Sequence, residues 1–233
     1  MLTLMTYPRN GAVFSLSPFC VKAALLLSFA KVPWQREDLN DPRKMPHRKL
    51  PVLRTANRLI ADSSEIRRYL EEQGTDFDPE LSAREKAQAQ ALTSMAEDSL
   101  YFYVVRDRWD NDQVWPTIRD NYFSEIPALI RRPITGAIRR SVHQGLQFQG
   151  LGRFSDSDRM QRLDTQLLAI SSLLKEHPFL MGNHLTSADL SVAAMLQALR
   201  STMVQTPTVD RISGDVVLSG YVDRIFHEAV PLP

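Results

Sequence analysis

Three groups of residues in the first third of the chain carry side chains or backbone geometry that could bind or activate a small polar molecule. Ser15, Ser17 and Cys20 stand together where a helix is expected to begin, because Ser17 is a good N-cap residue followed by a proline. The run Lys49-Leu50-Pro51-Val52-Leu53 is typical of a strand, and Asp62-Ser63 opens a second helix. Hydroxyls, a thiol, an ammonium group and a carboxylate are therefore the chemical groups of the candidate site.

The second and third groups form a β-hairpin that leads into a helix. A proline has no amide hydrogen, so Pro51 must begin its strand or lie at an edge, which leaves the backbone of Leu50 facing outward. Asp62 with Glu65 has the form of a capping box. An exposed strand edge, free helix amides and the side-chain oxygens of Asp62 and Ser63 would form a receptor for a small peptide with a carboxylate. The alternative is an ordinary edge strand and an ordinary helix cap, and this stretch taken alone favours that alternative.

The elements that must position these groups follow from the sequence pattern. We expect a buried strand over residues 2–7, a helix from Ser17 to about Lys31, and a second strand over residues 33–38. The hairpin and its helix, which ends near Gly74, complete this half of the chain. The order predicts a βαβ unit followed by a ββα unit.

The rest of the chain shows no convincing strand. Residues 75–79 are typical of a linker, and residues 81–108 predict one long helix. The run Leu185-Thr186-Ser187-Ala188-Asp189 has the form of a capping box with a hydrophobic staple. Further helices are expected near residues 117–131, 134–148, 156–176, 187–203 and 215–229. The chain is thus predicted to divide into an α/β domain, residues 1–75, and an all-helical domain, residues 80–233.

Composition excludes several function classes. Of the 233 residues 43% are hydrophobic and 24% charged, and the net charge of +1 does not call for nucleic acid or membrane lipid as a partner. No stretch has the roughly 20 apolar residues of a membrane-spanning helix, and the first residues lack a secretory pattern, so we expect a cytoplasmic protein. The single cysteine, Cys20, rules out an internal disulfide. The five histidines have no ligand spacing, and no metal is expected.

Together these motifs resemble the glutathione S-transferase family over nearly the whole chain. Ser15-Leu16-Ser17-Pro18-Phe19-Cys20 stands where the family places its catalytic hydroxyl or thiol, and Lys49-Leu50-Pro51-Val52-Leu53 matches its cis-proline strand. Asp62-Ser63 matches the pair that holds the γ-glutamyl end of glutathione, and the run at 185–189 matches the family's C-terminal capping box. Within the family, the 15–20 run and Val105-Arg106-Asp107-Arg108-Trp109 are similar to the failed-axon-connections and metaxin-like branch.

The resemblance implies a fold and an activity. The fold would be an α/β thioredoxin-like N-terminal domain followed by an all-α C-terminal domain, with a cis Leu50-Pro51 bond. The activity would be that of a glutathione transferase, with glutathione as co-substrate and a hydrophobic electrophile as its partner. A binding or interaction protein with the same fold is the alternative. The family also implies a homodimer, with residues 62–108 supplying most of the contact.

The implied roles begin with the thiol of glutathione, which is mostly protonated at neutral pH and must be stabilised as the anion. Ser17 at the N-cap would do this by hydrogen bonding and by the helix dipole. Ser15 is an alternative, and Ser17 could instead be only a cap, with its hydroxyl turned to the Cys20 amide. Cys20 is expected to be a small core residue, although a reactive thiol stays open.

The remaining implied roles are binding of the rest of glutathione and of the electrophile. Lys49 would reach the glycine carboxylate of glutathione, and the Leu50 backbone would pair with its cysteinyl peptide group. Tyr103 and Arg106, and after them Tyr101 and Trp109, would line the pocket for the electrophile, or else belong to the packing between helices.

Overall fold

A four-stranded sheet forms one side of the protein. The computed structural model describes residues 1–229 and residue 232. The strands are β1 (Leu2–Thr6), β2 (Trp34–Asp38), β3 (Val52–Arg54) and β4 (Leu59–Ala61), in the order β2-β1-β3-β4. β1 runs parallel to β2 and antiparallel to β3, and β4 is antiparallel to β3. With the helices that follow β1 and β4, this is the predicted βαβ and ββα arrangement.

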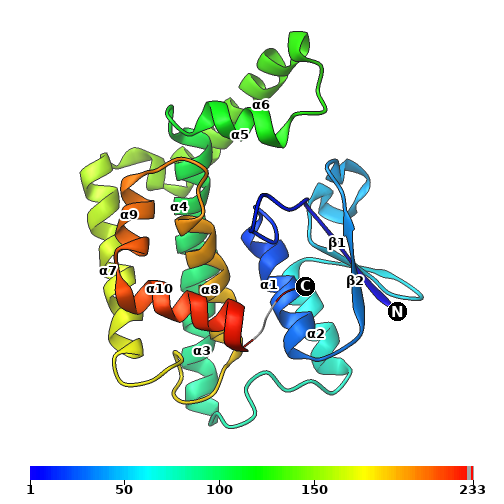
Figure 1. Ribbon diagram of the computed structural model, residues 1–233, viewed down its shortest axis with the longest axis vertical. Helices are drawn as coiled ribbons and strands as arrows, with labels where there is room; N and C mark the ends of the chain where they lie inside the picture. Colours follow the sequence, from blue (N-terminus) through cyan, green and yellow to red (C-terminus); the bar gives the residue numbers. More distant parts are fainter. Residues whose placement is uncertain (230–231, 233) are drawn as a thin grey trace.

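Two helices lie between the sheet and the helical half, α1 (Pro18–Phe29) and α2 (Ser63–Glu72) (Figure 1). The sequence predicts one apolar face for α1, but the helix is buried on almost every side, from Cys20 to Leu27. This is because α8 (Ser187–Arg200) packs against the side of α1 that faces away from the sheet. A helix buried all round must also bury any polar residue it carries, and in α1 that residue is Lys22.

Every element of the second half that the structure describes is a helix, as predicted. Its longest helical stretch is the column of α3 (Ala83–Met95), a π-helical turn at Ala96–Leu100, α4 (Tyr101–Val105) and a second π-helical turn at Arg106–Asp110. The sequence predicts this stretch as one regular helix over residues 81–108. The other helices are α5 (Trp115–Tyr122), α6 (Ala128–Gln149), α7 (Asp156–Leu174), α8, α9 (Pro207–Ser213) and α10 (Val216–Asp223).

Two details of the helical half differ from the prediction. The break expected between residues 131 and 134 lies earlier, between α5 and α6, and Pro133 is inside α6. Pro133 has no amide hydrogen, so the carbonyl of Leu129 loses its helical hydrogen bond. Leu129 is 94% exposed, so water can bind this carbonyl and the helix tolerates the proline. α9 is not predicted. Together α5 and α6 extend beyond the other helices at the top of Figure 1.

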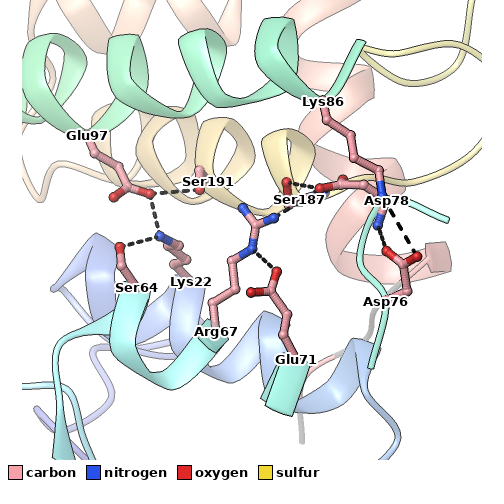
Figure 2. Close-up of polar contacts among 10 residues, drawn as sticks. All are labelled: Lys22, Ser64, Arg67, Glu71, Asp76, Asp78, Lys86, Glu97, Ser187 and Ser191. Carbon is pink, nitrogen blue, oxygen red and sulfur yellow. Dashed lines mark hydrogen bonds and ion pairs between the residues drawn. The ribbon is translucent and has the colours of Figure 1, made fainter. Parts of the chain in front are cut away.

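Buried ion pairs join the two halves (Figure 2). The Lys22 ammonium on α1 lies 2.5 Å from a carboxylate oxygen of Glu97, in the first π-helical turn, and donates to the Ser64 hydroxyl at 3.4 Å. Glu97 also accepts a hydrogen bond from the Ser191 hydroxyl on α8, at 2.8 Å. Lys22 is only 2% exposed, so this carboxylate supplies the charge that a buried ammonium needs.

The segment predicted as a linker, residues 75–79, is held firmly between the halves. Asp78 accepts hydrogen bonds from the backbone amide and the hydroxyl of Ser187 on α8, both at 2.9 Å, and from Arg67 on α2 at 3.0 Å (Figure 2). Phe77 is buried and stacks on Phe29 at 5.1 Å between ring centroids. The connection is therefore part of the interface and fixes how the two halves face each other.

Within the described residues, no helix is long and apolar enough to cross a membrane. In the same part of the chain, histidine, cysteine, aspartate and glutamate form no group of three or more that could hold a metal ion.

Candidate functional site

A cavity of about 840 Å³ opens between the sheet half and the helical half. One wall is polar and comes from the start of α1, the approach to β3 and the end of β4. The other wall comes from the α3–α4 column, α5 and α6, and it is rich in aromatic and aliphatic side chains. The polar wall includes Tyr7, Ser17, Lys49, Leu50, Pro51 and Asp62. The apolar wall includes Tyr101, Phe102, Val105, Trp109, Tyr122, Phe123, Ile138 and Val142.

Ser17 lies at the cavity and Ser15 does not. Ser17 is the N-cap of α1, and its hydroxyl oxygen accepts a hydrogen bond from the Cys20 amide at 3.4 Å. The hydroxyl is therefore turned to the Cys20 amide, as the cap alternative expects, but as an acceptor there it still has a proton to donate. Ser15 is buried outside the cavity lining, and its oxygen accepts from the Ser17 amide at 3.3 Å. Cys20 is completely buried, which raises the pKa of its thiol.

The hairpin brings Lys49, Leu50, Pro51 and Asp62 to one side of the cavity. The Leu50-Pro51 bond is cis, as predicted. The Asp62 amide donates to the Pro51 carbonyl at 3.3 Å, which joins the proline turn to the start of α2. The exposed Asp62 carboxylate accepts from the Ser64 amide at 2.7 Å, so Asp62 is the cap of α2, although Glu65 pairs with Arg68 and does not reach back.

Ser63 lies next to this group but is not part of the cavity lining. It is 1% exposed, and among the described residues its hydroxyl oxygen has no hydrogen-bond partner. A buried hydroxyl without a partner is costly and uncommon.

Tyr103 and Arg106, expected as candidates for the electrophile pocket, lie outside this cavity. Tyr103 is buried in the core, where burial raises the pKa of its hydroxyl. Arg106 donates to Asp156 at the start of α7, at 2.6 Å. The reason is helical spacing. The side of the column that faces the cavity carries the pairs 97/98, 101/102, 104/105 and 108/109, and positions 103 and 106 fall between these pairs.

Of the aromatic candidates, Tyr101 and Trp109 do line the cavity, whereas the sequence reasoning missed Tyr7, Tyr122 and Phe123. Tyr7 at the end of β1 faces the cavity, and burial raises the pKa of its hydroxyl, so the phenol stays protonated at neutral pH. Trp109, Tyr122 and Phe123 pack together, with ring centroids of Trp109 at 6.0 Å from Tyr122 and 6.1 Å from Phe123. The 3.6-residue spacing of 101, 105 and 108 could have identified one part of this wall, but the contribution of α5 depends on tertiary structure.

Arg108 is the charged residue that the column contributes at the aromatic end of the cavity. It is buried, and its guanidinium donates to the carbonyl of Ala198 on α8 at 2.6 Å and to the carbonyl of Leu16. It also lies 3.4 Å from the Tyr122 hydroxyl oxygen. Through Leu16, this side chain reaches the loop that ends at Ser17.

The sequence and structure match known proteins along the whole chain. Residues 18–115 match the model of the glutathione S-transferase N-terminal domain. The chain is 26% identical to the isoprene-epoxide–glutathione S-transferase of Rhodococcus sp. (strain AD45), over 97% of this chain and 98% of the relative.

Solved structures share the fold. Glutathione transferase GSTFuA3 from Phanerochaete chrysosporium has a TM-score of 0.66 at 19% identity, covering 96% of this chain and 95% of its own. A glutathione S-transferase-I with bound lactoylglutathione has a TM-score of 0.61 at 13% identity, covering 98% and 95%.

These matches agree with the architecture already described, a thioredoxin-like half followed by a helical half. The finer similarity to the failed-axon-connections and metaxin-like branch stays a prediction. The chain thus has the glutathione S-transferase fold, and it is similar to that family in the region of the N-terminal domain model and, along its full length, to one curated transferase.

Proposed function

We propose that the chain is a glutathione transferase, which stabilises the thiolate of glutathione for attack on a small hydrophobic electrophile. One observation carries this proposal: a single cavity combines the polar groups at the start of α1 and around Pro51 with an aromatic wall from the helical half. A peptide thiol and an apolar electrophile need two such surfaces side by side.

The polar wall suits glutathione. The backbone of Leu50 at the cis-proline turn would pair with the cysteinyl peptide group, and Lys49 would bind the glycine carboxylate. Asp62 lies where it would meet the α-amino group of the γ-glutamyl end, and the buried hydroxyl of Ser63 would gain a carboxylate as its partner if the start of α2 shifts slightly on binding.

Ser17 is the residue that we assign to the thiolate. Its hydroxyl proton can be donated while its oxygen accepts from the Cys20 amide. The dipole of α1 contributes about 0.3 to 1 kcal/mol and a hydrogen bond to the anion about 1.5 to 3 kcal/mol, which together lower the thiol pKa by about one to three units. Ser15 is the weaker candidate, because it lies outside the cavity lining.

The aromatic wall suits an electrophile with an apolar body. The curated relative is named for isoprene epoxide, so a small epoxide is the first electrophile to test on this chain. Phenyl and indole rings at Phe102, Trp109 and Phe123 would exclude water from the reacting carbon.

The test is a conjugation assay that measures loss of glutathione against a small aliphatic epoxide and a generic aryl halide. Ser17→Ala is expected to lower kcat/KM by about ten- to a hundredfold, the loss of one charge-assisted hydrogen bond, with little change in glutathione affinity when binding is measured below the pKa of the bound thiol. Ser15→Ala is the matched control and should retain activity. The reverse pattern would move the role to Ser15. Absence of turnover in a chain that binds glutathione would favour the interaction-protein alternative.

The same proposal includes two domains, at residues 1–75 and 80–233. It also includes a homodimer in which residues 62–108 supply most of the contact. Sedimentation at micromolar concentration should give a species of twice the mass of the chain. A species of the chain's own mass would contradict the dimer without affecting the proposed chemistry.

A further inference from the structure

Arg108 is a buried cation at the cavity whose counter-ion is not within the described chain. The side chain is 3% exposed and lines the cavity. Its hydrogen-bond acceptors are the carbonyls of Leu16 and Ala198 and the hydroxyl of Tyr122, all of them neutral. Its Nε is buried with no acceptor among the described residues. A buried guanidinium that meets only dipoles carries a large uncompensated desolvation cost.

The carboxylates that are close to Arg108 in the sequence, or that line the cavity, bond other residues or are exposed to solvent. Asp107, the adjacent residue, accepts from the Thr206 hydroxyl at 3.0 Å on the other side of the column. Glu97 pairs with Lys22. Asp62 and Asp98 are exposed. None of these four forms an ion pair with Arg108 in the described structure.

The other titratable groups around the cavity do not supply a negative charge either. Burial raises the pKa of the Cys20 thiol on α1 and of the Tyr7 hydroxyl on β1, so both stay protonated at neutral pH. Burial also raises the pKa of Tyr101 on α4, although the charge of Arg108 acts in the opposite direction. The rim carries further positive charge, at Lys49 and Arg9.

The guanidinium lies close to the place where the proposed reaction forms an anion. Arg108 donates to the Leu16 carbonyl, and the next residue is Ser17, the N-cap of α1 at the cavity. Beside the apolar wall of the cavity, a fixed positive charge close to this cap stabilises an anion more than the same charge would in bulk water.

We propose that Arg108 supplies the positive charge that balances the glutathione thiolate bound at Ser17. This inference rests on the proposed function. The thiol proton leaves to solvent, the sulfur keeps the electron pair, and Arg108 acts through its charge without touching the sulfur. Ser17 donates the hydrogen bond, and Arg108 makes the ionised form favourable in the cavity. The same arrangement accounts for a cation that lacks a carboxylate partner among the described residues.

The test compares two ligands that differ only at sulfur, glutathione and S-methylglutathione, which has no ionisable thiol. Their affinities are measured by calorimetry between pH 6 and 9 for the unchanged protein, Arg108→Gln and Arg108→Lys. The ultraviolet absorbance of the bound thiolate is followed over the same range. Arg106→Gln is the matched control, because Arg106 pairs with Asp156 outside the cavity.

Removal of the charge is expected to raise the pKa of the bound thiol by about one unit, within the range for loss of a nearby opposite charge. The affinity for glutathione at pH 8 should then fall about three- to tenfold in Arg108→Gln, and the affinity for S-methylglutathione should stay within twofold. Arg108→Lys should restore most of the thiolate signal, and Arg106→Gln should leave it unchanged.

An equal loss of affinity for both ligands in Arg108→Gln would overturn the inference. Arg108 would then only hold the loop before α1 and helix α8 together. An unchanged thiol pKa in an Arg108→Gln protein that folds would also overturn it. If Arg108→Gln does not fold, Arg108→Lys decides: the same thiol pKa as in the unchanged protein supports the inference, and a pKa raised by a unit or more contradicts it. Failure of the unchanged protein to bind either ligand would instead contradict the proposed function.

Discussion

Cations at two places in the described structure differ in where their counter-ions lie. Lys22, which is buried, and Arg67, which is half-buried, lie between the two halves, and each has a carboxylate within 3.0 Å, from Glu97 and Asp78. Arg108, at the cavity, has only neutral acceptors among the described residues. A cation that holds the fold together is balanced by the chain itself. A cation at a binding cavity can be left for a ligand to balance.

The largest effect on stability is expected at Glu97, the counter-ion of the buried Lys22. Glu97→Ala removes the carboxylate that pairs with the buried Lys22 ammonium. The ammonium then keeps its hydrogen bond to the Ser64 hydroxyl, at 3.4 Å. The free energy of unfolding should fall by about 3 to 5 kcal/mol, the usual cost of breaking a buried ion pair from one side. Urea unfolding followed by circular dichroism measures this change.

Two variants sharpen this result. Glu65→Ala removes an exposed carboxylate that pairs with Arg68 at 3.0 Å and should cost less than about 1 kcal/mol. The double variant Lys22→Met, Glu97→Leu removes both charges and should recover most of the lost stability. A Glu97→Ala protein as stable as Glu65→Ala would show that the pair does not hold the halves together.

The next largest effect is expected at Asp78, which bonds Arg67 and both donors of Ser187. Asp78→Ala should lower the free energy of unfolding by about 2 to 3 kcal/mol, because it leaves buried donors without an acceptor. Asp112→Ala, which removes an exposed partner of Arg139, is the control. Equal stability of the two variants would mean that the segment at 75–79 is a plain linker, as the sequence suggests.

The smallest effect concerns Ser63, whose buried hydroxyl has no recorded partner in the described chain. Ser63→Ala should change the stability of the free protein by less than about 0.5 kcal/mol and weaken glutathione binding by about 1 to 2 kcal/mol, because the γ-glutamyl carboxylate loses a donor. Calorimetry and thermal unfolding measure the two quantities. Unchanged affinity would remove Ser63 from the proposed ligand contacts.

The parts of the fold that local signals determine could be predicted from the sequence. Ser17 before a proline begins α1, and Pro51 occupies the cis turn before β3. Thr186 and Asp189 also interact as expected, since the Asp189 carboxylate accepts from the Thr186 amide and hydroxyl at 2.9 and 2.7 Å. Each of these features depends on residues a few positions apart.

The parts that depend on distant contacts could not be predicted. Lys22 and Glu97 are 75 positions apart, and nothing in the sequence of α1 signals that α8 covers its second side. The sequence assigned Tyr103 and Arg106 to the electrophile pocket because they are the right chemical types in the right helix. Which side of that helix meets the cavity depends on its packing and on the two π-helical turns, and that side carries Arg108.

Calorimetric titration of the unchanged protein with glutathione tests the central claim most directly. The account predicts saturable binding with a Kd between about 1 μM and 1 mM, through the cavity wall formed by Lys49, Leu50 and Asp62. Heats indistinguishable from those of buffer, at protein concentrations high enough to detect millimolar binding, would contradict it.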